Sequence, residues 1–498
     1  MRWLREQTAF ATFGIAMDQD QTPWFQAMHD LTGYPVFHVS GFWWPSAGAA
    51  EWYGGYDDWS ASRLNVANLQ TIRASGDHSA LFLFDLHFAS GATNWSSTSA
   101  GDSVAPWSPF EMLPDPESGG WRYVCPATQE WQAFHGWRDT ELGRLYDPDA
   151  AYYDISAGLG RMRCTRTAHG HPNGQGRWMV DGYRGMFARD RAAVDAGHGS
   201  RVPQGMELIS DVFLREMDFY QARAWGGPIA MLEGDPLRQQ VNVGNAEPVP
   251  LFDFVYHDVG PVRLDGNLKL APELGDIFYL VAGRTTLWGG LPELNYELSA
   301  LERFPGMTGP TYYETYALPF WVQDDTPYSV DAAKAAFLAD IGAARTSFGT
   351  EYLALGQMQR PPRFVSSVPI VGLPYALYNH FARATDLSTG VEAGQEFLDQ
   401  GTHQAPSLLS SAYTSGSGSI GLFVLNVADA AQSPEVEIDP ARHGASFLNY
   451  SLRRVEAGGA TALGLRHGRR EGTLTFSTTR PCRSPSAVAP PASTRRSE

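Results

Sequence analysis

Cysteine is scarce in this chain of 498 residues, which contains only Cys125, Cys164 and Cys482. Three cysteines cannot form an extensive disulfide framework, and their separation along the chain lacks the short ligand spacing of zinc motifs. We therefore expect neither a disulfide-stabilised fold nor a zinc site, and the sequence predicts no cofactor.

Positive charge and long hydrophobic runs are also lacking. Lysine and arginine total 37 against 54 aspartates and glutamates, a formal net charge of -17. This balance argues against nucleic acid or an anionic membrane as a partner. No segment is apolar over the length needed to span a bilayer, and Met1–Glu6 lacks the apolar run of a signal peptide. We expect a soluble protein, cytoplasmic or, if its N-terminus is truncated, secreted.

Aromatic residues are abundant, with 15 tryptophans, 21 tyrosines and 26 phenylalanines. Several tryptophans stand beside glycine, proline or acidic residues in expected loops, as Trp43 and Trp44 do, and Asp58 follows in the same loop. Aromatic faces next to carboxylates suit the apolar faces and hydroxyls of a sugar. A carbohydrate is therefore the partner that the composition favours.

Strand-like and helix-like segments alternate through the first 350 residues. Apolar runs predict eight barrel strands, at 34–40, 79–86, 121–125, 150–154, 205–211, 217–221, 249–255 and 284–288. Helical spacing lies between or beside them at 22–31, 60–74, 128–145, 174–196 and 270–282, with a further helix at 331–346. This rhythm predicts an α/β fold, a (β/α)8 TIM barrel over residues 1–350 with long loops at its active site. No glycine-rich phosphate loop follows the first strand, which argues against a nucleotide-binding fold.

The composition of the sequence changes after Arg360. Short apolar segments separated by glycine, serine and proline predict a C-terminal β-sandwich over residues 360–480. The tail at 481–498 is rich in serine, proline and arginine and is expected to be disordered.

Two carboxylates end neighbouring strands. Asp154 closes the fourth strand and Glu207 lies in the fifth, so a barrel brings them to one mouth, as a retaining glycosidase requires. In that chemistry one carboxylate attacks the anomeric carbon while the other protonates the leaving oxygen. Asp154 could instead cap the following loop, and Glu207 could pair with a barrel arginine. Asp211 is the reserve acid if Glu207 points into the core.

Histidines offer a second candidate chemistry. His169 and His171 are separated by one residue, and a metal site would need further ligands, for which His257 and Asp258 are candidates. We favour hydrogen bonding of these side chains to substrate hydroxyls, although a loop-stabilising role stays open.

The run Ala151–Ser156, the sequence His169-Gly170-His171-Pro172, and the pieces Tyr256-His257-Asp258 and Leu287-Trp288-Gly289-Gly290 resemble a bacterial glycoside-hydrolase-like barrel family of unknown function. The resemblance spans roughly residues 32–301. It implies a TIM barrel related to α-amylase-like and endo-α-N-acetylgalactosaminidase-like enzymes. In those enzymes the nucleophilic aspartate ends strand four and the acid/base glutamate ends strand five, which correspond to Asp154 and Glu207.

The sequence thus predicts a retaining glycoside hydrolase that acts on a sugar, by resemblance an α-linked one. The residues expected to bind the substrate are Trp43, Trp44, Asp58, His169, His171, Asp211, His257, Asp258 and Trp288. Two alternatives stay open: a carbohydrate-binding barrel without catalysis, and a metal-dependent hydrolase centred on the histidines.

Overall fold

The structure is a computed structural model. It describes residues 1–17, 20–41, 64–84, 87–89, 111–114, 121–154, 164, 166–222, 248–268, 270, 275–295, 330–379, 397–443, 449–456, 459–467 and 472–475.

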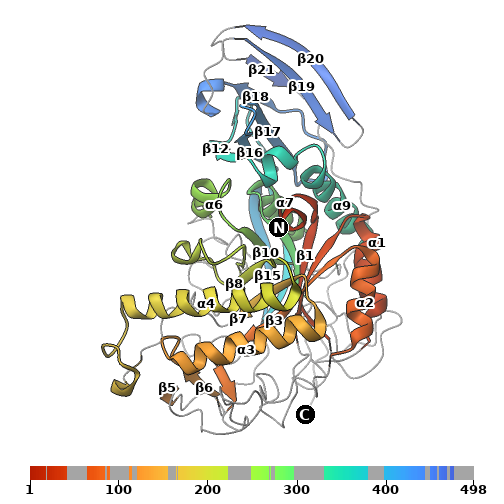
Figure 1. The fold of residues 1–498 in the computed structure, drawn as a ribbon. Helices are drawn as coiled ribbons and strands as arrows, with labels where there is room; N and C mark the ends of the chain where they lie inside the picture. The colour runs from red at the N-terminus through yellow and green to blue at the C-terminus, as the bar shows by residue number, and fades with distance from the viewer. Residues whose placement is uncertain are drawn as a thin grey trace, which may run out of the picture.

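Eight parallel strands close into a barrel (Figure 1). In order around the barrel they are β1 (Phe10–Ala16), β2 (Val36–Gly41), β3 (His78–Phe84), β7 (Ala150–Asp154), β8 (Gln204–Glu207), β9 (Phe219–Gln221), β10 (Val262–Leu268) and β11 (Leu291–Asn295). The helices of the barrel region are α1 (Thr22–Thr32), α2 (Val66–Ser75), α3 (Gln129–Tyr146), α4 (Arg177–His198), α6 (Leu251–Tyr256), α7 (Ile277–Leu287) and α9 (Ala332–Thr346). The predicted TIM barrel is confirmed.

Several predicted strands are wrong in detail. The first barrel strand, β1, was missed, and residues 121–125 contribute instead β6 (Trp121–Val124) to a separate sheet with β4 (His87–Ala89) and β5 (Glu111–Pro114). Residues 249–255 contain helix α6, and residues 284–288 lie largely within helix α7. The seventh and eighth strands are therefore β10 and β11. The omission of β1 and the extra strand at 121–125 cancel in the strand count. Asp154 therefore still ends the fourth strand and Glu207 the fifth.

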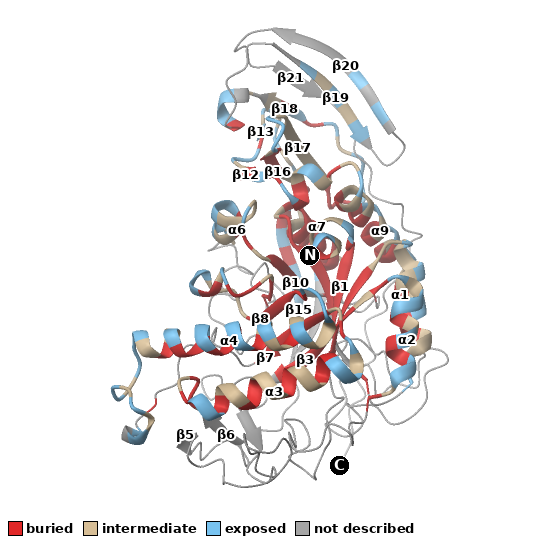
Figure 2. Ribbon diagram, in the orientation of Figure 1, coloured by how far each residue is buried: buried red, intermediate tan, exposed pale blue. Residues whose placement is uncertain are grey.

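Strand register divides the barrel side chains into two sets. The partners Phe82↔Tyr152, Tyr152↔Gly205 and Gly205↔Phe219 follow one row around the barrel. Members of this row touch across the interior, because the rings of Tyr152 and Phe219 stack with centroids 6.3 Å apart, and those of Phe82 and Tyr152 lie 5.4 Å apart. Figure 2 shows the strands as the most continuously buried part of the fold. Every second residue of each strand therefore points into an aromatic core.

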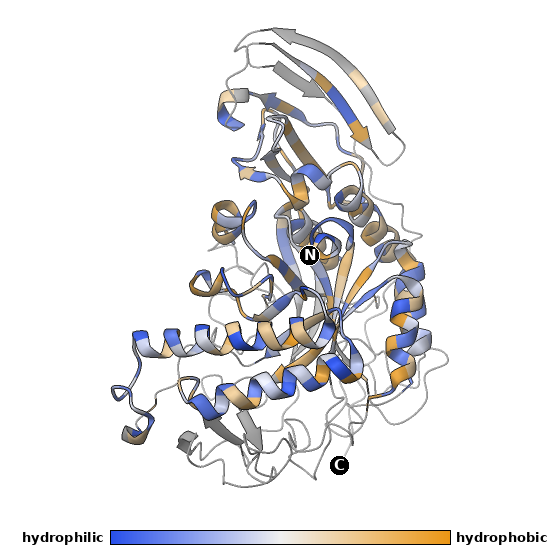
Figure 3. Ribbon diagram, in the orientation of Figure 1, coloured by the Kyte–Doolittle hydropathy of each residue, from blue (hydrophilic) through white to orange (hydrophobic). Residues whose placement is uncertain are grey.

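Burial on both strand faces explains the sequence of the barrel strands. All five residues of β7 are buried, the first four without an ionisable carboxylate or ammonium group among them. Covered parallel strands carry such apolar runs because helices pack on their outer faces. Figure 3 shows the same contrast in hydropathy between the strands and the outer faces of helices α3 and α4. Among the described residues, no helix has both the length and the apolar character of a membrane span.

Antiparallel sheets follow the barrel, and most of them lie beyond the end at which its strands begin, while one two-stranded pair overlaps the barrel in this view (Figure 1). They pair β12 (Gln357–Gln359), β16 (Leu408–Thr414) and β17 (Ile420–Asn426); β13 (Arg363–Phe364), β18 (Glu435–Ile438) and β21 (Gly472–Thr475); β14 (Ile370–Asn379) and β15 (Phe397–Pro406); and β19 (Asn449–Glu456) and β20 (Gly459–His467). The small all-β region is confirmed, while the boundaries at 350, 360 and 480 stay predictions. Tyr413 of β16 joins the two parts by donating a hydrogen bond to Leu287 O at 2.7 Å.

Gly205 is the point at which the barrel interior tolerates no side chain. A Cβ added there would lie 2.3 Å from the Phe219 ring. We expect Gly205→Ala to lower the free energy of unfolding by about 1–3 kcal/mol, the usual cost of overpacking a core. Urea unfolding measures this, with Gly416→Ala as the control because a Cβ at Gly416 meets nothing within 4 Å. Equal stability of Gly205→Ala and wild type would contradict this packing, whereas partial recovery in Gly205→Ala/Phe219→Leu would support it.

Candidate active site

Three inward polar side chains, Asp154, Glu207 and Gln221, end their strands at the carboxyl end of the barrel, and Glu293 of β11 joins them through Gln221. Asp154 and Gln221 stand two residues beyond the inward Tyr152 and Phe219, and Glu207 stands two residues beyond the inward Gly205. Side chains two apart on a strand share a face. All four are buried, with Asp154 5% and Glu207 3% exposed. The aromatic core is thus topped by a compact polar layer.

Asp154 and Glu207 are direct neighbours in this layer. The pairs Tyr152↔Gly205 and Tyr153↔Met206 fix the register of β7 against β8, and the next step along both strands sets Asp154 beside Glu207. Neighbouring strands lie about 4.8 Å apart. The fold therefore brings the two predicted carboxylates side by side, which their separation of 53 positions in the sequence does not require.

Hydrogen bonds tie this layer together. The Tyr152 hydroxyl donates to Asp154 Oδ1 at 3.0 Å and lies 3.5 Å from Gln221 Oε1. Gln221 Nε2 donates to Glu293 Oε1 at 3.0 Å. A phenolic donor stabilises negative charge on a carboxylate and holds its orientation. The Tyr152 hydroxyl thus holds the orientation of the Asp154 carboxylate from the core side of the layer.

The backbone is strained next to Glu207. Leu208 has φ 63, a left-handed conformation that a bulky non-glycine residue rarely adopts. The Leu208 N–H donates to Gln221 O at 2.8 Å, which keeps the chain against β9 through this turn. Strained residues of this kind concentrate at functional sites, where the surrounding structure holds them. The strain marks the exit of β8 as a place where the position of Glu207 is tightly set.

Two members of the layer were not predicted. Gln221 ends the weak sixth strand, where the alternation after Phe219 could have indicated it. Glu293 was missed because the eighth strand was placed at 284–288, before the true strand β11. The arginine alternative for Glu207 finds no support on the barrel strand β10, because Arg263 binds Asp253 and Asp265 on the outer face.

The structure brings some predicted substrate residues to this end of the barrel. Asp211 begins the short 3-10 helix Asp211–Phe213 after β8, and its side chain is exposed. His169 and His171 lie in the connection from β7 to α4 and are partly buried. Trp43, Trp44 and Asp58 lie outside the described residues.

The two histidines have unexpected neighbours. Cys164 Sγ lies 3.2 Å from His169 Nδ1, and Cys125 Sγ lies 3.2 Å from His171 Nε2. Both thiols are buried, and burial together with the nearby Cys164 raises the pKa of Cys125 to about 12. In the absence of a bound metal, Cys125 is therefore a neutral thiol and not a nucleophile.

His257, Asp258 and Trp288 lie at the opposite end of the barrel, which corrects their expected place in the sugar site. The expected strand before His257 is helix α6, and Trp288 caps helix α7. Segments that follow a helix and precede the next strand lie at the amino-terminal end of a TIM barrel, away from its active-site loops. The pattern Tyr256-His257-Asp258 therefore marks a structural junction.

His257 fills this junction tightly. Its Nδ1 lies 2.7 Å from Gly356 O and its Nε2 lies 3.0 Å from Leu353 O. Burial lowers its pKa, which favours the neutral ring. Gly289 adopts φ +82, and a Cβ there would lie 1.8 Å from His257 Nε2, which explains the glycine after Trp288. His257 thus links the barrel to the segment that leads into the C-terminal sheets.

We expect His257→Ala to lower the free energy of unfolding by about 1–3 kcal/mol, because the neutral ring donates to one of the two carbonyls and that buried carbonyl loses its donor. Urea unfolding measures the effect, with Val259→Ala as the control because Val259 is 77% exposed. Equal stability of His257→Ala and wild type would contradict this role of His257.

A buried charged cluster supports β7 from outside the barrel. Tyr153, beside Asp154, donates to Asp139 Oδ2 at 2.7 Å, and Arg138 pairs with Asp139 at 2.7 Å. His135 Nδ1 lies 3.2 Å from Asp190 Oδ2 between helices α3 and α4. Burial raises the pKa of Asp190 to about 8.

The raised pKa of Asp190 has a consequence for stability. The folded protein holds this proton at a pH where the unfolded chain releases it, so the stabilisation is complete below the unfolded pKa of about 3.9 and is lost as the pH rises through about 8. We expect the melting temperature of wild type to fall more steeply between about pH 5 and pH 8 than that of Asp190→Asn, which cannot ionise. Asp181→Asn, an exposed change on the same helix, is the control. Parallel curves for wild type and Asp190→Asn would refute the shift.

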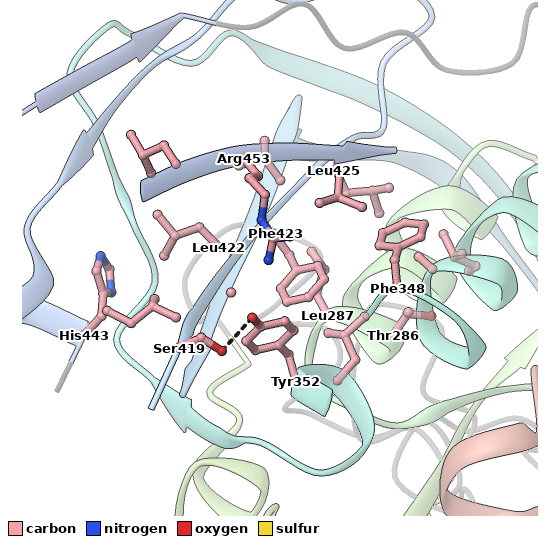
Figure 4. A pocket seen from close by; sticks show the side chains of 18 of the residues that line it. Thr286, Leu287, Phe348, Tyr352, Ser419, Leu422, Phe423, Leu425, His443 and Arg453 are labelled. Carbon is pink, nitrogen blue, oxygen red and sulfur yellow. Dashed lines mark hydrogen bonds between the residues drawn. The ribbon is translucent and has the colours of Figure 1, made fainter. Parts of the chain in front are cut away.

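A separate pocket lies far from the carboxylates. It lies between helices α7 and α9 and strands β17 and β19, and Figure 4 shows Tyr352 and Ser419 joined by a hydrogen bond of 2.9 Å on its wall. Leu287, Phe348, Leu422, Phe423 and Leu425 give it an apolar lining. Because α7 ends here just before β11 begins, the pocket belongs to the amino-terminal end of the barrel and holds no pair of carboxylates.

Comparisons with known proteins agree with this architecture. A family model described as a domain of unknown function (DUF6259) matches residues 2–263. No curated protein matches the sequence. The noncanonic maltogenic α-amylase AmyB from Thermotoga neapolitana superposes with a TM-score of 0.53 over 95% of this chain and 99% of that chain, at 10% identity.

Two further structures are more distant. An α-amylase from Malbranchea cinnamomea has a TM-score of 0.47 at 10% identity, covering 95% of each chain. An α-N-acetylgalactosaminidase from Bifidobacterium bifidum has a TM-score of 0.45 at 12% identity, covering 84% of this chain and 58% of that one. At 10% identity, the likeness to the α-amylase AmyB establishes a shared fold. The predicted resemblance to a glycoside-hydrolase-like barrel family of unknown function is confirmed.

Proposed function

The chain belongs to the DUF6259 family, and we propose that it is a retaining glycoside hydrolase with Asp154 as nucleophile and Glu207 as general acid/base. The observation that carries this proposal is the pair of inward carboxylates on adjacent strands β7 and β8, set side by side by the register. Retaining glycosidases use two carboxyl groups about 5–5.5 Å apart, which matches adjacent strand ends about 4.8 Å apart.

In the first step, an Asp154 oxygen attacks the anomeric carbon while Glu207 protonates the departing glycosidic oxygen. The leaving group departs as an alcohol, and a covalent glycosyl ester forms on Asp154. In the second step, Glu207 removes a proton from water, the water oxygen attacks the anomeric carbon, and the Asp154 carboxylate is released. The sugar keeps its anomeric configuration because it undergoes two inversions.

The residues around the pair support this division of roles. The Tyr152 hydroxyl donates to Asp154, which keeps that carboxylate oriented for attack. Glu207 is buried and lies beside Asp154 on the neighbouring strand, the arrangement of an acid/base and a nucleophile in a retaining pair. Asp211, Trp43, Trp44 and Asp58 are proposed to contact the sugar, and an α-linked substrate follows from the family resemblance.

The test is turnover of aryl α- and β-glycosides by wild type, Asp154→Ala and Glu207→Gln. We expect Asp154→Ala to lose at least about a thousandfold in kcat/KM, because no covalent intermediate can form. Glu207→Gln should lose much less on substrates with an activated aryl leaving group, which needs no proton, than on native glycans. Asp181→Asn, at an exposed acid on helix α4, is the control, and Asp211→Asn tests the reserve acid.

The outcomes separate the candidate functions. Rescue of Asp154→Ala by azide with inverted product configuration would support Asp154 as nucleophile. A larger loss in Asp211→Asn than in Glu207→Gln would move the acid to Asp211. Saturable glycan binding without turnover in wild type and all variants would replace the enzyme by a carbohydrate-binding barrel.

A further inference from the structure

Four potential metal ligands meet next to the beginnings of helices α3 and α4. Cys125 directly follows β6 and precedes helix α3, while Cys164, His169 and His171 lie in the connection between β7 and α4. One ligand atom from each of the four residues lies within 4.8 Å of the other three. Among the residues that the structure describes, no other group of three or more histidine, cysteine or acidic side chains has this geometry.

The dimensions suit a tetrahedral zinc ion. Zinc binds sulfur at about 2.3 Å and nitrogen at about 2.0–2.1 Å, so a sulfur and a nitrogen on one tetrahedron lie about 3.5 Å apart. The observed sulfur-to-nitrogen distances, Cys125 to His171 and Cys164 to His169, are both 3.2 Å. A small expansion of the cluster accommodates the ion.

The surroundings hold the histidine rings in the orientation that a metal needs. His171 Nδ1 lies 2.9 Å from Pro172 O, so it carries the proton and leaves the lone pair of Nε2 facing Cys125. Trp178 stacks on the His171 ring at 3.4 Å with an interplanar angle of 5°. Outer-shell contacts of this kind are a regular feature of metal sites.

The loop itself is folded around the cluster. Cys164 and Gly174 form an isolated antiparallel bridge, with Gly174 N donating to Cys164 O at 2.8 Å. Gly170 and Gly174 have positive φ values of 74 and 94, which let the chain turn tightly between the ligands. Hydrogen bonds therefore close the loop on the same residues that supply the ligand atoms.

We propose that Cys125, Cys164, His169 and His171 bind one structural zinc ion. Two thiolates and two imidazoles form a soft, four-coordinate set that favours zinc over magnesium or calcium. Protein groups fill all four positions, so no site is left for a reactive water, and the role is structural. The ion fastens the segment that follows Asp154 to the start of helix α3. This inference stands apart from the proposed glycosidase, which it neither needs nor proves.

Metal content of the full chain tests the proposal. Wild type, expressed with zinc and dialysed, should hold about one zinc per chain by elemental analysis. Cys125→Ser, Cys164→Ser and His171→Ala should each lose most of it, whereas Cys482→Ser, a change at the remaining cysteine, should retain it. Replacement of zinc by cobalt(II) in wild type should give the visible bands of a tetrahedral site and thiolate-to-cobalt charge transfer.

A second measurement on wild type covers variants that fail to fold. Cys125 and Cys164 should resist alkylation until a chelator is added, and chelation should lower the melting temperature, because bound metal stabilises the folded state. Absence of metal with both thiols alkylated freely would overturn the proposal. So would a Cys125–Cys164 disulfide found by non-reducing mass spectrometry, or full zinc content in all three ligand variants. None of these readouts depends on glycosidase activity.

Discussion

Closure of the eight-stranded barrel is the constraint on which the rest of the structure depends. Backbone hydrogen bonds fix each strand against its neighbours, and the alternation of side chains then leaves no freedom in which residues face the axis. Tyr152, Gly205 and Phe219 share one inward row. The same parity carries Asp154 and Glu207 to the top of that row. A shift of β8 by one residue would turn Glu207 outward and remove the pair of carboxylates.

The two ends of the barrel carry different groups of residues. At the carboxyl end the polar layer of Asp154, Glu207, Gln221 and Glu293 lies above an aromatic core. At the amino-terminal end, His257 and Tyr413 join the barrel to the segments around β12 and β16 through hydrogen bonds to backbone carbonyls. Of the motifs that carry the family resemblance, His169-Gly170-His171-Pro172 lies at the carboxyl end of the barrel and Tyr256-His257-Asp258 at the amino-terminal end. The motif by itself does not indicate at which end it lies.

Outside the barrel, buried polar clusters hold the two helices next to β7. Arg138, Asp139 and Asp190 lie in the contact between α3 and α4, and the proposed zinc ligands join the beginnings of the same helices. The strand that carries Asp154 is thus supported along its outer face and at its exit. Buried polar groups that satisfy one another tolerate little displacement, because an unsatisfied buried polar group is costly. This favours a rigid setting for Asp154.

The sequence by itself determined the barrel, the small β region and the two strand-end carboxylates, because apolar runs, helical spacing and strand ends are local patterns. It misplaced β11, since the apolar residues of α7 are buried on all sides and their period does not distinguish helix from strand. It misplaced β10 because the short apolar run of α6 reads like a strand, although Leu251, Phe254 and Val255 are exposed. Only the tertiary structure decided that His257 is a junction residue and that Gln221 and Glu293 join the candidate site. It also brought Cys125 next to Cys164, which is 39 positions away along the chain, and next to His169 and His171. Contacts between distant segments depend on how the strands close, and no local spacing records that.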